Sequence, residues 1–153
     1  MCQNLGGMKA LTYLTVQDIL WTNLRVTGNV QTYRFADLEE ATYYQYAYGG
    51  SSDVLRQAER FLTGFVSKAP LGKANMATAF VGFVAFLRLN SFDLKLTDGN
   101  AASVFEKAHG TGWISELVSP VEDHHGEGKA NVRAAITSVL EDFAGTIKTL
   151  SAN

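Results

Sequence analysis

The side chains with the most obvious capacity for chemistry stand in one short polar segment. His124 and His125 are adjacent, and Glu122, Asp123 and Glu127 surround them. Imidazole and carboxylate groups are the ligands that zinc and other transition metals take in proteins. Two adjacent histidines cannot both point at one ion from a helix face, and the H-x₃-H spacing that would allow it is missing. We therefore favour a solvated polar loop, with a metal site as the alternative.

The other catalytic candidates are isolated. His109 precedes Gly110 near the end of a predicted helix, where a charged imidazole interacts favourably with the helix dipole. Cys2 is the single cysteine and stands in the terminal region, so the sequence contains no internal disulfide and no cysteine-rich zinc site. The pattern shows neither a Ser–His–Asp nor a Cys–His arrangement for nucleophilic catalysis.

A third candidate lies where one predicted helix ends and the next begins. Pro70 stops the first helix, Gly72 allows the chain to turn, and the second helix starts near Lys73. The free N–H groups and the dipole at a helix start favour an anion such as phosphate. A lysine there is unfavourable unless an anion or an acidic side chain lies beside it. A surface lysine at a tight turn is the simpler interpretation, and Gly72, Lys73 and Asn75 are the candidate phosphate-binding residues.

The elements that must position these groups are predicted to be helices, because the chain contains only two prolines and almost no strict apolar–polar alternation. Spacing and turn signals predict helices over residues 15–27, 35–48, 53–68, 74–89, 100–108 and 129–150. A short helix or turn is expected at 113–118 and a strand-like run at 11–14. Asp98 is expected to cap the helix over 100–108.

One of these helices differs from the rest. From Ala79 to Leu87 every residue is apolar or glycine, so this helix has no polar face. The run is too short to span a membrane, which takes roughly 20 apolar residues. The sequence therefore predicts an all-α fold of six to seven helices packed around a central buried helix.

Composition narrows the class of protein. The 153 residues are 46% hydrophobic and 18% charged, which predicts a packed core, and the net charge of −2 argues against a nucleic-acid partner. No signal pattern opens the chain, so we expect a cytoplasmic protein with no membrane association. Residues 1–7 are expected to form a flexible N-terminal extension, and residues 8–153 a single helical domain.

Residues 53–90, DVLRQAERFLTGFVSKAPLGKANMATAFVGFVAFLRLN, resemble the core of the Fic/Doc (death-on-curing) family. The signature of that family has the form H-P-F-x-[D/E]-G-N-K/G-R, followed by an apolar helix. In the matching register its positions are occupied, in order, by Ala69, Pro70, Leu71, Gly72, Lys73, Ala74, Asn75, Met76 and Ala77. The resemblance extends by pattern over roughly residues 8–110, and it implies the helical fold that the spacing also predicts.

The departures from the signature concern the catalytic groups. In the family the histidine is the general base, the acidic residue holds Mg²⁺ against the phosphates of a nucleotide, and the arginine stabilises phosphate charge. Here Ala69, Lys73 and Ala77 stand in those places. Loss of a positioned general base alone typically costs about 10²- to 10⁴-fold in rate. Asn75 is the only polar signature residue retained, and it could bind a phosphate or the backbone of the preceding loop.

These observations lead to two functional hypotheses. The first is a Fic/Doc-like protein of toxin–antitoxin lineage without AMP- or phosphate-transferase activity, which acts as a binding or interaction module. Its partner would be an antitoxin-like helical protein, and it could bind ATP or another nucleotide without Mg²⁺. The second is a nucleotide-dependent transferase that modifies a protein hydroxyl with a base from elsewhere, such as His109, His124 or His125.

Overall fold

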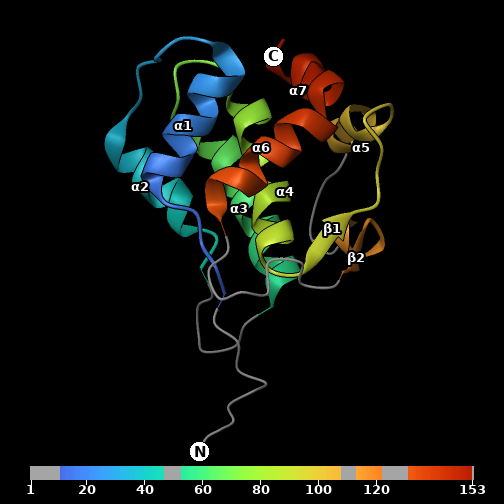
Figure 1. Ribbon diagram of the computed structural model, residues 1–153. Helices are drawn as coiled ribbons and strands as arrows, with labels where there is room; N and C mark the ends of the chain where they lie inside the picture. The colour runs from blue at the N-terminus through green and yellow to red at the C-terminus, as the bar shows by residue number, and fades with distance from the viewer. Residues whose placement is uncertain (1–10, 47–52, 108–112, 122–130, 153) are drawn as a thin grey trace, which may run out of the picture.

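The computed structural model describes residues 11–46, 53–107, 113–121 and 131–152, and these residues form an all-α fold (Figure 1). Its elements are, in chain order, α1 (Val16–Thr27), α2 (Phe35–Tyr43), α3 (Val54–Lys68), α4 (Asn75–Leu89), β1 (Phe92–Leu94), α5 (Ala101–Lys107), the 3₁₀ helix η1 (Trp113–Glu116), β2 (Val118–Pro120), α6 (Val132–Asp142) and α7 (Ala144–Ser151). The predicted fold class is thereby confirmed.

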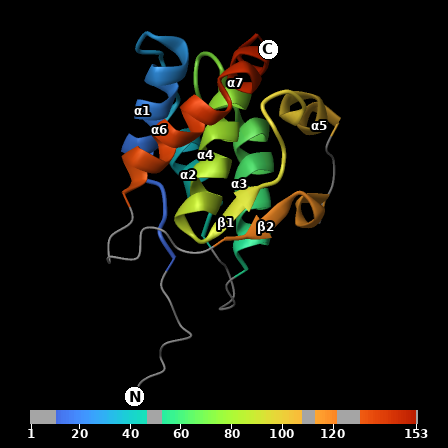
Figure 2. The ribbon, with the colours of Figure 1, turned by 45° about the vertical axis from the view of Figure 1, so that its right-hand side comes forward.

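Helix α4 lies at the centre of the molecule. It packs against α1, α3, α6, α7 and β1, and the two views agree that other helices surround it (Figures 1 and 2). Its side chains are buried from Ala77 to Leu87, as the absence of a polar face predicts. Phe80 meets Phe105 and Phe143 edge to face, with ring centroids 4.9 and 5.3 Å apart. None of the described helices is long and apolar enough to cross a membrane.

The carboxy-terminal helix, predicted as one element over residues 129–150, is two helices. Phe143 (φ −125°, ψ 34°) interrupts the helical backbone between α6 and α7. The physical reason is Asp98, whose carboxylate accepts hydrogen bonds from the backbone N–H groups of Gly145, at 3.0 Å, and Thr146, at 2.6 Å. The expectation that Asp98 caps the helix over 100–108 is therefore wrong, because this residue caps α7 instead.

Two short segments also differ from the prediction. Residues 92–94 and 118–120 form an antiparallel pair in which Asp93 lies opposite Ser119, and no alternation in the sequence signals it. The strand-like run at 11–14 is not in a strand. The buried amide of Gln45 replaces a neighbouring strand there, since its Oε1 accepts from the N–H of Leu14 (2.8 Å) and its Nε2 donates to the carbonyl of Leu14 (2.7 Å).

Helix α2 ends earlier than the predicted boundary at residue 48. Its last residue is Tyr43, and side chains of α3 bind the carbonyls that follow. Gln57 donates to the carbonyl of Gln45, and Arg60 donates to those of Tyr44 and Tyr46. Side-chain donors thus satisfy carbonyl groups that a longer helix would have bonded internally.

Candidate functional site

Several sequence candidates lie outside the described residues: Cys2, His109 and the segment that contains Glu122, Asp123, His124, His125 and Glu127. Among the residues that the structure describes, no group of three or more His, Cys, Asp or Glu side chains could hold a metal ion. The candidates that can be placed are Gly72, Lys73 and Asn75, at the entry to α4.

The turn between α3 and α4 uses two alanines in the left-handed backbone region. Ala69 (φ 43°) ends α3 and Ala74 (φ 61°) precedes α4. Gly72 is not among the residues with positive φ, so it does not serve as the turning residue that its type predicts. It is needed for close approach, because a Cβ there would lie 2.8 Å from Oγ1 of Thr32.

The segment before α2 closes over this turn. The N–H of Arg34 donates to the carbonyl of Pro70 (2.9 Å), and the N–H of Gly72 donates to the carbonyl of Thr32 (2.8 Å). The Arg34 guanidinium also donates to the carbonyls of Lys68 and Ala69, at 2.7 and 3.0 Å, so it caps the carboxyl end of α3. The turn is held by hydrogen bonds from a segment almost forty residues away in the sequence.

Asn75 makes its hydrogen bonds within the turn itself. Its Oδ1 accepts from the N–H of Leu71 (2.9 Å) and its Nδ2 donates to the carbonyl of Leu71 (2.8 Å). From the other side, Asn23 of α1 donates to the carbonyl of Lys73 (3.0 Å) and to Oγ1 of Thr78 (3.1 Å). Of the two roles expected for Asn75, the structure contains the bond to the preceding loop backbone.

The charged side chains near the turn are arranged in pairs. Arg34 and Lys68 bind Asp37 and Glu40, with contacts of 2.7 Å (Arg34–Asp37) and 3.0 Å (Lys68–Glu40). The hydrogen bond from Arg34 lowers the pKa of Asp37, and the hydrogen bond from Lys68 lowers that of Glu40. Lys73 differs: it is exposed, and no ion pair of its ammonium group is found within the described ranges. Among the described residues, Lys73 is therefore an exposed cation of the turn that lies outside these pairs.

A second feature, which the sequence did not single out, is the orientation of α1. Its buried side combines the apolar Ile19 with three polar residues, Asp18, Thr22 and Asn23. Its outward face carries Leu20, which is half-buried, and Leu24, which is exposed. Buried polar residues and exposed large apolar ones are the informative departures from the usual pattern. In α1 both departures occur in one helix.

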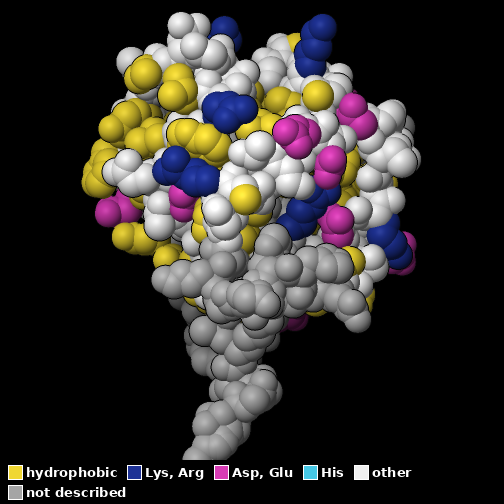
Figure 3. Space-filling model, in the orientation of Figure 1, with side chains coloured by type: hydrophobic (Ala, Val, Ile, Leu, Met, Phe, Trp, Pro, Cys, Tyr) yellow, Lys and Arg dark blue, Asp and Glu magenta, His cyan; other side chains and the backbone are white. Residues whose placement is uncertain are grey.

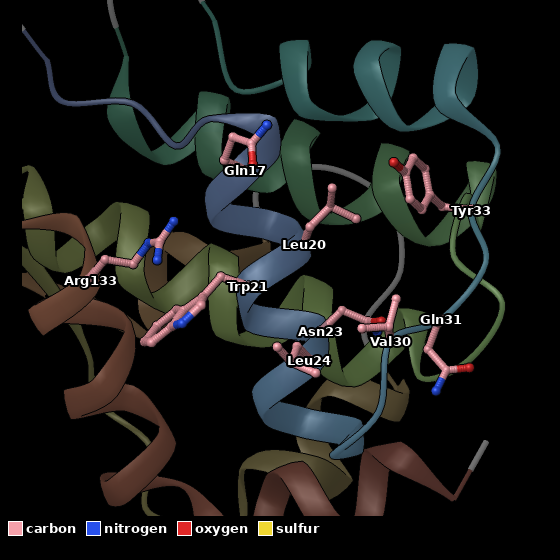
Figure 4. A pocket seen from close by; sticks show the side chains of 9 residues that line it. All are labelled: Gln17, Leu20, Trp21, Asn23, Leu24, Val30, Gln31, Tyr33 and Arg133. Atoms are coloured by element: carbon pink, nitrogen blue, oxygen red, sulfur yellow. The ribbon is translucent and has the colours of Figure 1, made fainter.

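The outward face of α1 is the floor of a cleft of about 360 Å³. One wall is the loop before α2, and α6 contributes a single side chain at the other side (Figure 4). Figure 3 shows apolar side chains gathered over α1 and this loop, with Lys and Arg side chains among them. Nine of the described residues line the cleft: Gln17, Leu20, Trp21, Asn23, Leu24, Val30, Gln31, Tyr33 and Arg133.

Trp21 is the centre of the charged part of this cleft. The guanidinium carbon of Arg133 lies 4.7 Å from the centroid of the Trp21 ring, and that of Arg25 lies 5.2 Å away. Arg133 also donates from Nε to Oδ1 of Asp18, at 3.0 Å. Both arginines are within the distance at which a cation is attracted by an aromatic face. The cleft thus combines apolar surface with the guanidinium group of Arg133, and the guanidinium group of Arg25 lies near Trp21.

The described tyrosines Tyr43, Tyr44 and Tyr46 are not among the residues that line the cleft. Tyr43 is exposed, Tyr44 packs over Gly64, and Tyr46 contacts Tyr13 with ring centroids 4.2 Å apart. Burial raises the pKa of Tyr46, since its phenolate form is disfavoured there. Tyr44 and Tyr46 thus contribute to packing.

The residues of α1 that line the cleft have a regular spacing in the sequence. Gln17, Leu20, Trp21 and Leu24 follow the i, i+3, i+4, i+7 pattern of one helix face. That pattern usually marks the buried side of a helix, and only the structure shows that this face points outward.

Comparison of the chain with known protein families, curated proteins and solved structures found no match. The resemblance to the Fic/Doc family therefore stays a prediction from the sequence pattern.

Proposed function

We propose that this chain is a Fic/Doc-like protein of toxin–antitoxin lineage that acts as a binding module and transfers neither AMP nor phosphate. The observation that carries the proposal is the cleft beside α1, which Leu20, Trp21 and Leu24 line although Leu20 and Trp21 also pack against the core. Contiguous exposed apolar surface of this kind typically marks an interaction site.

The turn before α4 supports the lineage and argues against transfer chemistry. Ala74 has the left-handed conformation that glycine adopts most easily, and the family signature has glycine at this position. Yet Ala69 and Ala77 offer no group for proton transfer or phosphate binding, and the amide of Asn75 is already bonded to Leu71. These features favour a turn that connects α3 and α4 without a catalytic role.

The partner that best fits this module is an antitoxin-like helical protein. An amphipathic helix can place its apolar face in a groove such as the one beside α1. To test this, the tagged chain is isolated from its source cells together with the proteins bound to it. We expect one stoichiometric partner that binds the unmodified chain and does not bind the Val30→Asp variant. Val30 is suited to this test because it is 84% exposed at the cleft, so the change cannot disturb the core.

The alternative function is a nucleotide-dependent transferase, and the exposed Lys73 at the start of α4 is the observation that favours it. Calorimetry with ATP, with and without Mg²⁺, tests nucleotide binding. Binding without Mg²⁺ that weakens in Lys73→Glu, with the exposed Lys95→Glu as the charge control, would support a nucleotide site at the turn.

Label transfer separates the two functions. The chain is incubated with the extract of its source cells and ATP labelled in the α- or γ-phosphate. The binding module predicts no labelled protein beyond the extract alone. Labelling that requires the chain and disappears in Lys73→Glu would overturn the module in favour of the transferase.

A further inference from the structure

We infer that the cleft beside α1 binds a peptide segment of a partner protein in which a carboxylate side chain is close to a large apolar one. This inference rests on the proposed function, since it specifies the chemistry of the partner. Two features of the cleft carry it, namely the fixed guanidinium group of Arg133 and the apolar surface next to it.

Arg133 is held in one orientation from two sides. Its Nε donates to Oδ1 of Asp18, and its plane lies near the ring of Trp21. Asp18 is fixed in turn, because its Oδ2 accepts from the N–H and the Oγ1 of Thr15, at 2.8 and 2.9 Å. The capping box of α1 therefore also positions a guanidinium group on another helix.

This arrangement leaves donors of Arg133 available. Only its Nε has a hydrogen-bond partner in the described part of the chain, and 46% of its side chain is exposed. The planar guanidinium group binds a carboxylate with two parallel hydrogen bonds, and little entropy is lost when its orientation is already fixed. Arg25 adds a second positive charge at Trp21, and none of the described residues that line the cleft is acidic, although Asp18 pairs with Arg133 at 3.0 Å. The charge of the site is thus complementary to an anion.

The apolar side chains of the cleft indicate that the ligand carries an apolar group next to its carboxylate. Leu20, Leu24 and Val30 line the same cleft, so a bare anion at the arginine would leave them exposed to water. The wall of the cleft is also exposed over some length, since Val30 and Tyr33 are 84% and 45% exposed. A free small carboxylate would leave these side chains uncovered, which is why a peptide segment is the better occupant. Trp, Tyr and Arg are also the residues in which binding energy concentrates at protein interfaces.

Selection from a phage-displayed library of random peptides tests the inference on the full chain. We expect enriched peptides to carry Asp or Glu near Leu, Ile, Phe or Trp. Synthetic copies are then titrated by fluorescence anisotropy against the chain and its variants. Arg133→Gln and Val30→Asp should each weaken binding at least tenfold, whereas the exposed Arg56→Gln on α3 and Val121→Asp after β2 should change it less than twofold. Circular dichroism verifies that each variant is folded.

The other outcomes overturn the inference. Enrichment of basic peptides would contradict the charge argument, and failure to enrich any peptide would contradict the site. Peptides that bind all variants equally would lie on another face, and the binding module would stand without this site. A dimer of the chain that Val30→Asp dissociates in sedimentation experiments would assign the face to a second copy instead. Transfer of label from ATP is the separate result that would overturn the proposed function itself.

Discussion

Gln45 shows how much of this fold depends on a single side chain. It is fully buried, and its amide bonds both backbone groups of Leu14 and the carbonyl of Thr42. A residue that could have been read as one more position on a helix face instead anchors the chain that leads into α1.

We expect Gln45→Leu to lower the free energy of unfolding by roughly 2 to 4 kcal/mol, because buried N–H and carbonyl groups lose their partners. The exposed Gln17→Leu should change it by less than about 0.5 kcal/mol. Urea denaturation followed by circular dichroism measures both. If both substitutions change the free energy of unfolding equally little, the backbone groups of Leu14 have other hydrogen-bond partners in the Gln45→Leu variant.

At the scale of the elements, two contacts decide how neighbouring helices meet. Asp98 joins the loop before α5 to the start of α7, and Gly64 of α3 lies directly against the ring of Tyr44. In both places a glycine allows the close contact. A Cβ at Gly145 would lie 2.9 Å from Oδ2 of Asp98, and a Cβ at Gly64 would lie 2.3 Å from Cδ2 of Tyr44.

The stabilisation provided by Asp98 should depend on pH. Hydrogen bonds from the backbone and hydroxyl of Thr146, and then from the N–H of Gly145, lower the pKa of Asp98 below its usual 3.8. The carboxylate therefore contributes its full stabilisation above about pH 4, and this is lost as pH falls through the lower pKa of the folded state. Asp98→Asn should reduce the urea midpoint at pH 6, and the difference from the unmodified chain should shrink toward pH 2.

The matched control for this experiment is Glu106→Gln, which removes one negative charge from an exposed position on α5. It should leave the urea midpoint at pH 6 almost unchanged. A difference between Asp98→Asn and the unmodified chain that stays constant from pH 6 to pH 2 would contradict the capping role of the charge.

We expect Gly64→Ala to destabilise the chain although alanine is the better helix former by about 1 kcal/mol. The added Cβ would lie 2.3 Å from Cδ2 of Tyr44, so the ring or the helix must move. Overpacking of this kind typically costs about 1 to 3 kcal/mol. Thermal unfolding should show a lower midpoint for Gly64→Ala, whereas the neighbouring exposed Thr63→Ala should be neutral or slightly stabilising.

At the scale of the whole molecule, the central helix α4 organises the core. Phe143, at the junction of α6 and α7, packs its ring against Phe80, and the guanidinium carbon of Arg88 lies 5.9 Å from its centroid. The side chain of Phe143 thus packs against α4 at the point where the helical backbone is interrupted between α6 and α7.

Phe143→Ala should therefore lower the free energy of unfolding by about 3 to 5 kcal/mol, the usual cost of removing a buried phenylalanine. Phe35→Ala removes the same atoms from an exposed position and should cost less than about 1 kcal/mol. Denaturant titration compares them. A small loss in both would indicate that the core closes around the space left by Phe143.

The helical class and the buried α4 could be predicted because they depend on local signals, namely apolar periodicity, caps and turn residues. The division of the last helix could not, since it depends on Asp98, which is distant in sequence from Phe143. The cleft was missed for another reason. Leu20, Trp21 and Leu24 have the spacing of a core face, and nothing local indicates that Asp18 and Asn23 are the buried side.

The two left-handed alanines at the turn before α4 also indicate how a more heat-resistant form of this protein could be engineered. An L-residue in that region is strained by roughly 1 to 2 kcal/mol, while glycine costs about 0.5 to 1 kcal/mol through the entropy of the unfolded chain. Ala69 is half-buried, so replacing it with glycine loses little packing, whereas Ala74 is buried and would lose more. We therefore expect Ala69→Gly to relieve backbone strain and raise the melting temperature without altering the cleft.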